Sequence, residues 1–183
     1  MKEKYKPTGI ILAGGKSSRM GVNKALVLFQ NQRMIDIARA KLARFADTIL
    51  VSSNEPIPDF DGQRVPDVIF EIGPLGGLFS CLNVSATEIN LVIPCDVPLL
   101  PASLYEQLWP LASAFDVVIP RLPDGKLEPL IGFYKKSTLA AMEEMIAAND
   151  FKLLHLFNKV NTYYFDIQET GIFKNVNTPN DLL

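Results

Sequence analysis

Short apolar runs alternate with longer segments of helical periodicity along most of the chain. The runs are four or five residues long, and several are rich in β-branched residues, as strands are. The segments between them repeat apolar residues every three or four positions, as a helix does when it covers one face of a sheet. This alternation predicts an α/β fold whose sheet is mostly parallel and partly mixed.

The same pattern gives approximate bounds for each element. We expect strands at 9–12, 48–52, 90–93, 116–119, 130–134 and 162–166, the fifth of which could run antiparallel. We expect helices at 33–45, 76–84, 101–112, 136–148 and 151–158, and a last helix that opens at Thr178-Pro179. No internal repeat or low-complexity segment interrupts the series. We therefore predict one domain over 1–183, with 1–7 as a flexible tail.

Composition adds a charge asymmetry to this picture. The chain has 183 residues and a net charge of −2. Residues 1–44 carry ten Lys or Arg and two acidic residues, whereas the remainder carries eight basic and eighteen acidic residues. A region that faces anions, followed by a region that offers carboxylates, suits a polyphosphate with a metal ion better than a nucleic acid.

Two cysteines and one histidine limit the possible chemistry. Cys81 and Cys95 cannot form a disulfide framework, and with His155 alone a zinc site is not expected. We interpret both cysteines as packed side chains and His155 as structural. Neither a signal peptide nor a membrane span is predicted, so a cytoplasmic protein without membrane contact is expected.

The first strand leads into a glycine-rich loop that carries cations. This loop reads Leu12-Ala13-Gly14-Gly15-Lys16-Ser17-Ser18-Arg19-Met20-Gly21-Val22-Asn23-Lys24. Glycines let the backbone N–H groups approach a polyphosphate, and Arg19 and Lys24 could neutralise its oxygens. A Walker A loop does not fit, because Ile10 stands where that motif has glycine. A solvated surface turn remains the alternative.

Polar residues follow other strands too. Asp96 comes directly after the apolar run at 90–93, where a carboxylate could bind Mg²⁺ or cap the following turn. Ser52, Ser53 and Asn54 stand at the end of the second strand. Because ligands bind at the carboxyl ends of parallel strands, this clustering predicts a single site.

Two further segments combine a structural and a functional interpretation. Gly73-Pro74-Leu75-Gly76-Gly77-Leu78 is either a tight helix entry or a place where Gly76 and Gly77 let a helix N-terminus approach a base or ribose. Asp67 is either an exposed loop acid or a nucleoside contact. In Asn175-Val176-Asn177-Thr178-Pro179, Thr178 suits a helix cap, while Asn175 and Asn177 could hydrogen-bond a heterocycle.

Together these motifs resemble one family across residues 9–183. The run Leu12-Ala13-Gly14-Gly15 with Arg19-Met20-Gly21 and Lys24 is similar to the signature of nucleotidyltransferases with a Rossmann-like fold of three layers. The other three motifs are Gly73-Pro74-Leu75-Gly76-Gly77-Leu78, Pro94-Cys95-Asp96-Val97-Pro98 and Asn175-Val176-Asn177-Thr178-Pro179. They narrow the resemblance to molybdenum cofactor guanylyltransferases.

This resemblance implies transfer of GMP from GTP to molybdenum–molybdopterin, with release of pyrophosphate and formation of the guanine dinucleotide cofactor. It implies a nucleotide site made of Leu12, Ala13, Gly14, Gly15, Lys24, Asp67, Gly76, Asp96, Asn175 and Asn177, with Arg19, Lys24 and Asp96 catalytic and Asp96 holding Mg²⁺. Transient contact with other cofactor-biosynthesis proteins or apo-molybdoenzymes is also implied.

Two positions depart from the family pattern. Asn23 stands where relatives commonly have Asp, and Lys152 stands where a relative would offer Arg to the pterin. A cytidylyltransferase acting on the same pterin, a transferase with a sugar or polyol phosphate acceptor, and a nucleotide-binding module without catalysis remain open.

Overall fold

A computed structural model describes residues 6–14, 23–168 and 171–173. Its strands are β1 (Thr8–Leu12), β2 (Leu28–Phe29), β3 (Gln32–Arg33), β4 (Ile49–Ser52), β5 (Gln63–Val65), β6 (Ile89–Pro94), β7 (Val117–Arg121), β8 (Gly132–Lys135) and β9 (Thr162–Asp166). Its helices are α1 (Met34–Leu42), α2 (Pro74–Val84), α3 (Ser103–Leu108), α4 (Leu139–Ala147) and α5 (Leu153–Leu156). Short 3₁₀ turns occupy η1 (Lys24–Leu26), η2 (Trp109–Leu111), η3 (Lys136–Thr138) and η4 (Gly171–Phe173).

Seven of the described strands form one sheet in the order β5-β4-β1-β6-β8-β7-β9. Strand β1 is parallel to β4 and β6, and β4 is parallel to β5. Strand β8 runs antiparallel to its neighbours β6 and β7, while β9 is parallel to β7. The prediction of a mostly parallel, partly mixed sheet is therefore confirmed, including the direction of the strand expected at 130–134.

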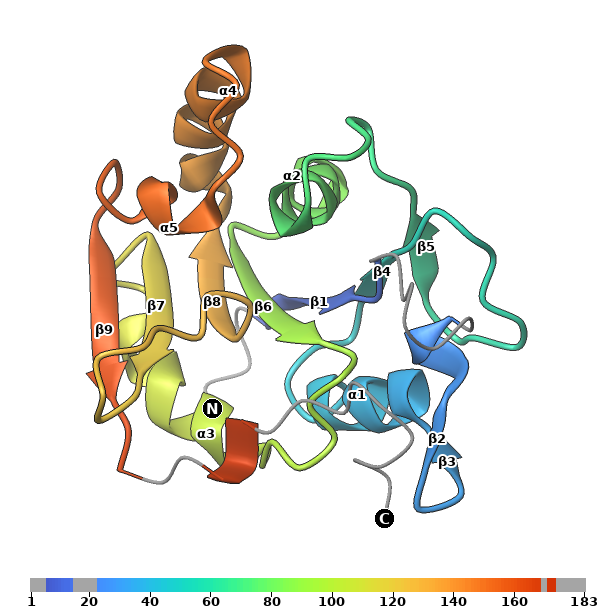
Figure 1. The fold of residues 1–183 in the computed structure, drawn as a ribbon. Helices are drawn as coiled ribbons and strands as arrows, with labels where there is room; N and C mark the ends of the chain where they lie inside the picture. The colour runs from blue at the N-terminus through green and yellow to red at the C-terminus, as the bar shows by residue number, and fades with distance from the viewer. Residues whose placement is uncertain (1–5, 15–22, 169–170, 174–183) are drawn as a thin grey trace.

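Helices cover both faces of this sheet, which gives three layers (Figure 1). Successive residues of β1 point to opposite faces, so Ile11 packs with Ile35 and Leu42 of α1, and Ile10 packs with Leu78 of α2. Helix α3 lies on the face of α1, and α4 and α5 lie on the face of α2. Burial of β1 on both faces explains its unbroken apolar sequence.

The pair β2–β3 is an element that the hydrophobic pattern did not predict. It forms a two-residue hairpin whose tip residues, Gln30 and Asn31, have φ of 49° and 65°. Positive φ at both positions is what such a turn requires, and it is usually supplied by Asn-Gly or Asp-Gly. The hairpin moves the start of α1 to Met34, since Arg33 belongs to β3.

The helix expected at 101–112 is divided. Helix α3 ends at Leu108, and the chain continues as a 3₁₀ turn because Pro110 has no N–H to donate to an α-helical ladder. The last helix, expected to open at Thr178-Pro179, lies outside the described residues. Among the helices of the described ranges, none has the length and hydropathy of a membrane span.

Candidate functional site

The strand register brings four polar or glycine positions into one row. Leu12 is paired with Ser52 on one side and with Pro94 on the other, and Ser52 is paired with Val65. The ends of β5, β4, β1 and β6 are therefore level. Two residues beyond these ends lie Asp67, Asn54, Gly14 and Asp96, respectively. Parallel strands with level ends explain why residues far apart in the sequence meet at one edge.

Backbone hydrogen bonds continue beyond the strand ends and hold the first loop residues in place. The Ala13 N–H donates to the Ser52 carbonyl at 3.0 Å, and the Cys95 N–H donates to the Leu12 carbonyl at 3.1 Å. The residues that precede Gly14 and Asp96 are thus fixed by the sheet.

Asp67 is held by three hydrogen bonds. Its Oδ1 accepts from Ser52 Oγ at 3.2 Å and its Oδ2 accepts from Asn54 Nδ2 at 3.1 Å. The Asp67 backbone N–H donates to Asn54 Oδ1 at 2.8 Å. Arg64 supports this group by donating to the carbonyl of Ser53 at 3.2 Å. Asn54 and Asp67 therefore present one oriented set of amide and carboxylate groups.

The N-terminus of α2 lies against this group. Gly73 precedes the helix with φ of 67°, and Pro74 occupies its first turn. A Cβ at Gly77 would overlap Ser52 Oγ and lie 3.1 Å from Ser52 Cβ, so the close approach of α2 to β4 requires glycine there. Gly76 faces the preceding loop instead, because a Cβ there would lie 2.9 Å from the Ile69 carbonyl oxygen.

Lys24 and Asp96 form an ion pair with 3.2 Å between Nζ and Oδ2. The lysine side chain is 26% exposed and the carboxylate 17%, so both are sheltered but reachable from solvent. Asn23 places Lys24 by capping η1, with its Oδ1 accepting from the Ala25 N–H at 3.0 Å. The Asp that the family resemblance implies at this position would offer an oxygen acceptor as well, so the cap does not depend on which of the two is present.

The turn that follows Asp96 is fixed from α1. Lys41 Nζ donates to the carbonyl oxygens of Pro98 at 2.6 Å and Val97 at 3.2 Å. Burial lowers the pKa of Lys41 to about 8. The two carbonyl oxygens act in the opposite direction, because they accept hydrogen bonds from the ammonium group.

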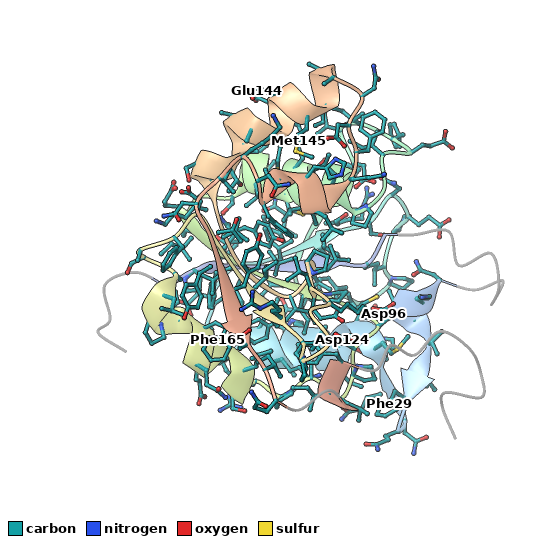
Figure 2. The ribbon with its side chains drawn as sticks, turned by 60° about the vertical axis from the view of Figure 1, so that its left-hand side comes forward. Phe29, Asp96, Asp124, Glu144, Met145 and Phe165 are labelled. Atoms are coloured by element: carbon teal, nitrogen blue, oxygen red, sulfur yellow. The ribbon has the colours of Figure 1, made fainter. Side chains whose placement is uncertain are left out.

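The strand ends and the start of α2 line a cleft of about 1410 Å³, which suits a ligand of nucleotide size or larger. Leu12, Ala13, Gly14, Asn54, Asp67, Gly77 and Asp96 contribute to it from the strand ends and α2. Residues 125–131, between β7 and β8, form another part of the wall together with Phe70 and Leu154. In Figure 2 Asp96 lies toward the end of the molecule that carries Phe29, far from Glu144 and Met145 of α4.

The predicted site residues can now be placed. Leu12, Ala13, Gly14, Lys24, Asp67 and Asp96 all line the cleft. Gly76 lies one position away from the lining residue Gly77, and its contact with a ligand stays a prediction. Gly15, Arg19, Asn175 and Asn177 lie outside the described residues. Lys152 is exposed at the start of α5 and is absent from the cleft lining described here.

Burial separates the cysteines from nucleophilic chemistry. It raises the pKa of Cys81 and that of Cys95 to about 12, so both thiols stay protonated near neutral pH. His155 is half exposed, and its Nδ1 lies 2.8 Å from Asp150 Oδ2 at the start of α5. The two cysteines are packed side chains, as predicted, whereas a structural role for His155 stays a prediction.

Three residues of the arrangement had no assigned role in the sequence. Ser52 and Asn54 were visible as polar residues after a strand, but nothing in the sequence pairs them with Asp67. Lys41 lies in an amphipathic helix where lysine is ordinary, and its acceptors are 56 and 57 residues away. Of the three residues, Ser52 and Asn54 could have been linked to the site from the sequence, through their position at a strand end.

Comparison with known proteins gives the family. Residues 9–161 match the model of the MobA-like NTP transferase domain. A probable molybdenum cofactor guanylyltransferase of Flavobacterium johnsoniae is 34% identical over 96% of this chain and 94% of its own length. One from Pelotomaculum thermopropionicum is 35% identical, with coverage of 96% and 90%.

A solved structure has the same fold. It is the molybdopterin-guanine dinucleotide biosynthesis protein A of Archaeoglobus fulgidus, with a TM-score of 0.80 and 21% identity over 96% of this chain and 94% of that one. The three-layer fold expected from the resemblance is thus confirmed. With a family model over most of its length and curated relatives above 30% identity, the chain belongs to the MobA-like NTP transferases, in the family of molybdenum cofactor guanylyltransferases.

Proposed function

We propose that this protein transfers GMP from GTP to the phosphate of molybdenum–molybdopterin, with release of pyrophosphate. The observation that carries this proposal is the meeting of the Lys24–Asp96 pair with the Ser52–Asn54–Asp67 group along one cleft at level strand ends. The first group suits phosphates and a metal ion, and the second suits a nucleoside. The names of the curated relatives supply the base and the acceptor.

In this proposal the backbone at Leu12, Ala13 and Gly14 contacts the nucleotide. A Cβ at Gly14 would meet Ser52 Oγ at 3.7 Å, an ordinary contact distance, and Gly14 does not have a positive φ. The described residues therefore do not themselves require glycine at this position. Close approach of a ligand to the backbone would be a sufficient reason for glycine at position 14. Gly15, Asn175 and Asn177 belong to the nucleotide site by resemblance.

Mg²⁺ is the metal that we propose for the site. Asp96 offers a hard carboxylate oxygen at the cleft wall, and no group of three acidic, His or Cys side chains in the described ranges could cage a metal by itself. This donor set fits Mg²⁺, which typically takes one or two carboxylates and completes its shell with phosphate oxygens and water. When bound, the ion would neutralise charge on the phosphates.

The residues would then act by position and charge. An oxygen of the acceptor phosphate attacks the α-phosphorus of GTP, and the bond from that phosphorus to the bridging oxygen of the leaving group breaks. Pyrophosphate leaves with the electron pair. The acceptor is already anionic, so no protein base has to remove a proton. Lys24 stabilises the leaving pyrophosphate, as would Arg19 by resemblance, and Asp67 with Asn54 orients the nucleoside.

Location and protein partners are part of the same proposal. Cys81 and Cys95 are free and buried, which suits a reducing compartment such as the cytoplasm. Transient contact with other cofactor-biosynthesis proteins or apo-molybdoenzymes follows from the chemistry of the product, which is a cofactor made for other enzymes.

Pyrophosphate release tests the proposal. Wild-type protein is supplied with Mg²⁺, molybdenum–molybdopterin and one of GTP, CTP, ATP or UTP. We expect release with GTP that depends on the acceptor. Preference for CTP would replace the proposal with a cytidylyltransferase, and no release with any nucleotide would leave a binding module.

Asp96→Asn tests the metal role in the same assay. It removes the charge but keeps the size of the side chain, so we expect turnover to fall at least about 100-fold. Asp47→Asn is the matched control, because Asp47 is 76% exposed and pairs only with Lys6 among the described contacts. Turnover of Asp96→Asn equal to that of Asp47→Asn would contradict the role of Asp96.

A further inference from the structure

We propose that Lys41 is a positioning residue that holds the turn after Asp96 and thereby fixes the Asp96 carboxylate against Lys24. This inference rests on the proposed function, since it concerns how the site is kept in shape for phosphoryl chemistry. Lys41 lies outside the cleft lining described above, so it acts through Asp96.

Lys41 donates to the backbone of the turn after Asp96. Lys41 Nζ donates to two consecutive carbonyl oxygens, those of Val97 and Pro98, at 3.2 and 2.6 Å. The Val97 carbonyl also accepts from the Leu100 N–H at 3.2 Å, which closes the turn. In the described part of the chain Lys41 forms no ion pair. Its ammonium group therefore stabilises the backbone of the turn beside Asp96.

Asp96 has a buried neighbour on each side in the chain. Cys95 and Val97 on either side of it are 5% and 2% exposed, and Leu100 is fully buried. The Cys95 N–H is bonded to the end of β1. Cys95 is therefore fixed by the sheet, whereas the far side of Asp96 is fixed by the turn that Lys41 holds. With both flanks fixed, the Cα of Asp96 is held at the position from which its carboxylate reaches Lys24.

Helix α1 is hydrogen-bonded to the segments that carry both members of the ion pair. Helix α1 follows η1 and the hairpin directly, and its first N–H, that of Met34, donates to the Val27 carbonyl at 2.9 Å. The segment with Lys24 is thus attached to the start of α1, and the turn after Asp96 is attached near its end. Lys41 couples the two loops that carry the 3.2 Å pair.

The cost of this placement supports a specific role. Burial lowers the pKa of Lys41 to about 8, so the fold keeps a lysine where its charged form is disfavoured by desolvation. A lysine with no structural role would avoid this desolvation cost by keeping its ammonium group in solvent.

Lys41→Met tests the inference, because it keeps the length of the side chain and removes the donors. Lys136→Met is the matched control: its Nζ also donates to a backbone carbonyl, that of Ser85 at 2.7 Å, where α2 ends. Both variants should unfold at a lower temperature than wild type. Only Lys41→Met should raise the Mg²⁺ concentration for half-maximal turnover and lower kcat, by about 10-fold. Lys41→Arg, which retains donors, should recover part of the loss.

The outcomes separate this inference from the proposed function. An inactive wild type overturns the proposed function and with it the basis of the inference. An active wild type with equal Mg²⁺ dependence and kcat in Lys41→Met and Lys136→Met overturns the role of Lys41 alone. Thermal unfolding of each variant shows that the compared proteins are folded at the assay temperature, and a Lys41→Met protein that is unfolded there is replaced by Lys41→Gln.

Discussion

At the scale of single residues, the site depends on how closely α2 approaches the end of β4. Ser52 Oγ is bonded to Asp67 Oδ1, and Gly77 leaves the space in which that hydroxyl lies. Gly77 therefore helps to orient the Asp67 carboxylate indirectly, by leaving space for the Ser52 hydroxyl that donates to it. A side chain at this position changes packing and the nucleoside end of the cleft together.

Gly77→Ala should lower both stability and nucleotide affinity. Alanine favours a helix by up to about 1 kcal/mol over glycine, but overpacking costs about 1–3 kcal/mol. The free energy of unfolding in urea should fall by about 1 kcal/mol, and the Kd for GTP should rise, because the Ser52 hydroxyl is displaced from Asp67.

Ser52→Gly provides the control for this clash. The double variant with Gly77→Ala should be less destabilised than the two single changes add up to, since the new methyl group then has space. Additive losses would contradict the clash. A GTP affinity of Gly77→Ala equal to wild type would contradict the link to Asp67.

The predicted residues that line the cleft were found through different signals. Asp96 follows a predicted strand and Lys24 closes a glycine-rich loop, and strand ends gather ligand contacts. Asp67 was expected as a nucleoside contact through the family resemblance. Asn54 and Ser52 received no role because their partner is Asp67, and a sequence does not show which side chains pair. Lys41 was invisible for a similar reason, since its acceptors are backbone atoms of a distant turn.

At the scale of elements, continuous apolar runs predicted the central strands and period-3.6 patterns predicted most helices, but neither predicted the β2–β3 hairpin. Two-residue strands are too short for a pattern, and Gln30-Asn31 lacks the glycine that usually marks such a turn. Strand β5, with three residues, is also too short for a pattern, yet it positions Asp67. The strands that the sequence did not predict are thus the shortest ones.

The edge strand β9 offers a test of stability against pH. Arg121 at the end of β7 is the register partner of Asp166 at the end of β9 and contacts it through Nε at 2.7 Å and Nη2 at 3.1 Å. These hydrogen bonds lower the pKa of Asp166 below the usual 3.8. The unfolded chain therefore binds the proton more tightly, and the pair stabilises the fold above the unfolded pKa and ceases to do so as pH falls through the folded value.

Arg121→Met should accordingly be less stable than wild type at pH 6, by the small amount typical of exposed pairs. Urea unfolding should show this difference closing as the pH falls below the usual pKa of 3.8. In an Asp166→Asn background the arginine change should have no such pH dependence. A difference that is constant from pH 6 to pH 3 would show that packing, rather than the ion pair, is responsible.

At the scale of the whole molecule, the charge asymmetry of the sequence becomes a feature of the site. Lys24 comes from the basic first quarter and Asp96 from the acidic remainder, and the fold brings them within 3.2 Å. The sequence predicted the two regions and the strand ends that join them. It could not predict the wall at 125–131, because that segment has no motif and lines the cleft only through the position of β7 and β8.

Ligand binding should stabilise the whole fold in a way that discriminates between nucleotides. A ligand at 100 times its Kd adds about 2.7 kcal/mol, which for a chain of this size raises Tm by about 5–10 °C. We expect this shift in thermal unfolding with GTP and Mg²⁺, and a smaller one with CTP at equal concentration. An equal or larger shift of Tm with CTP would contradict the selectivity for guanine that the names of the relatives suggest. Retention of the Mg²⁺-dependent part of the GTP shift in Asp96→Asn would show that the metal is held without this carboxylate. Since binding is measured without turnover, the experiment tests the nucleotide half of the cleft independently of the acceptor.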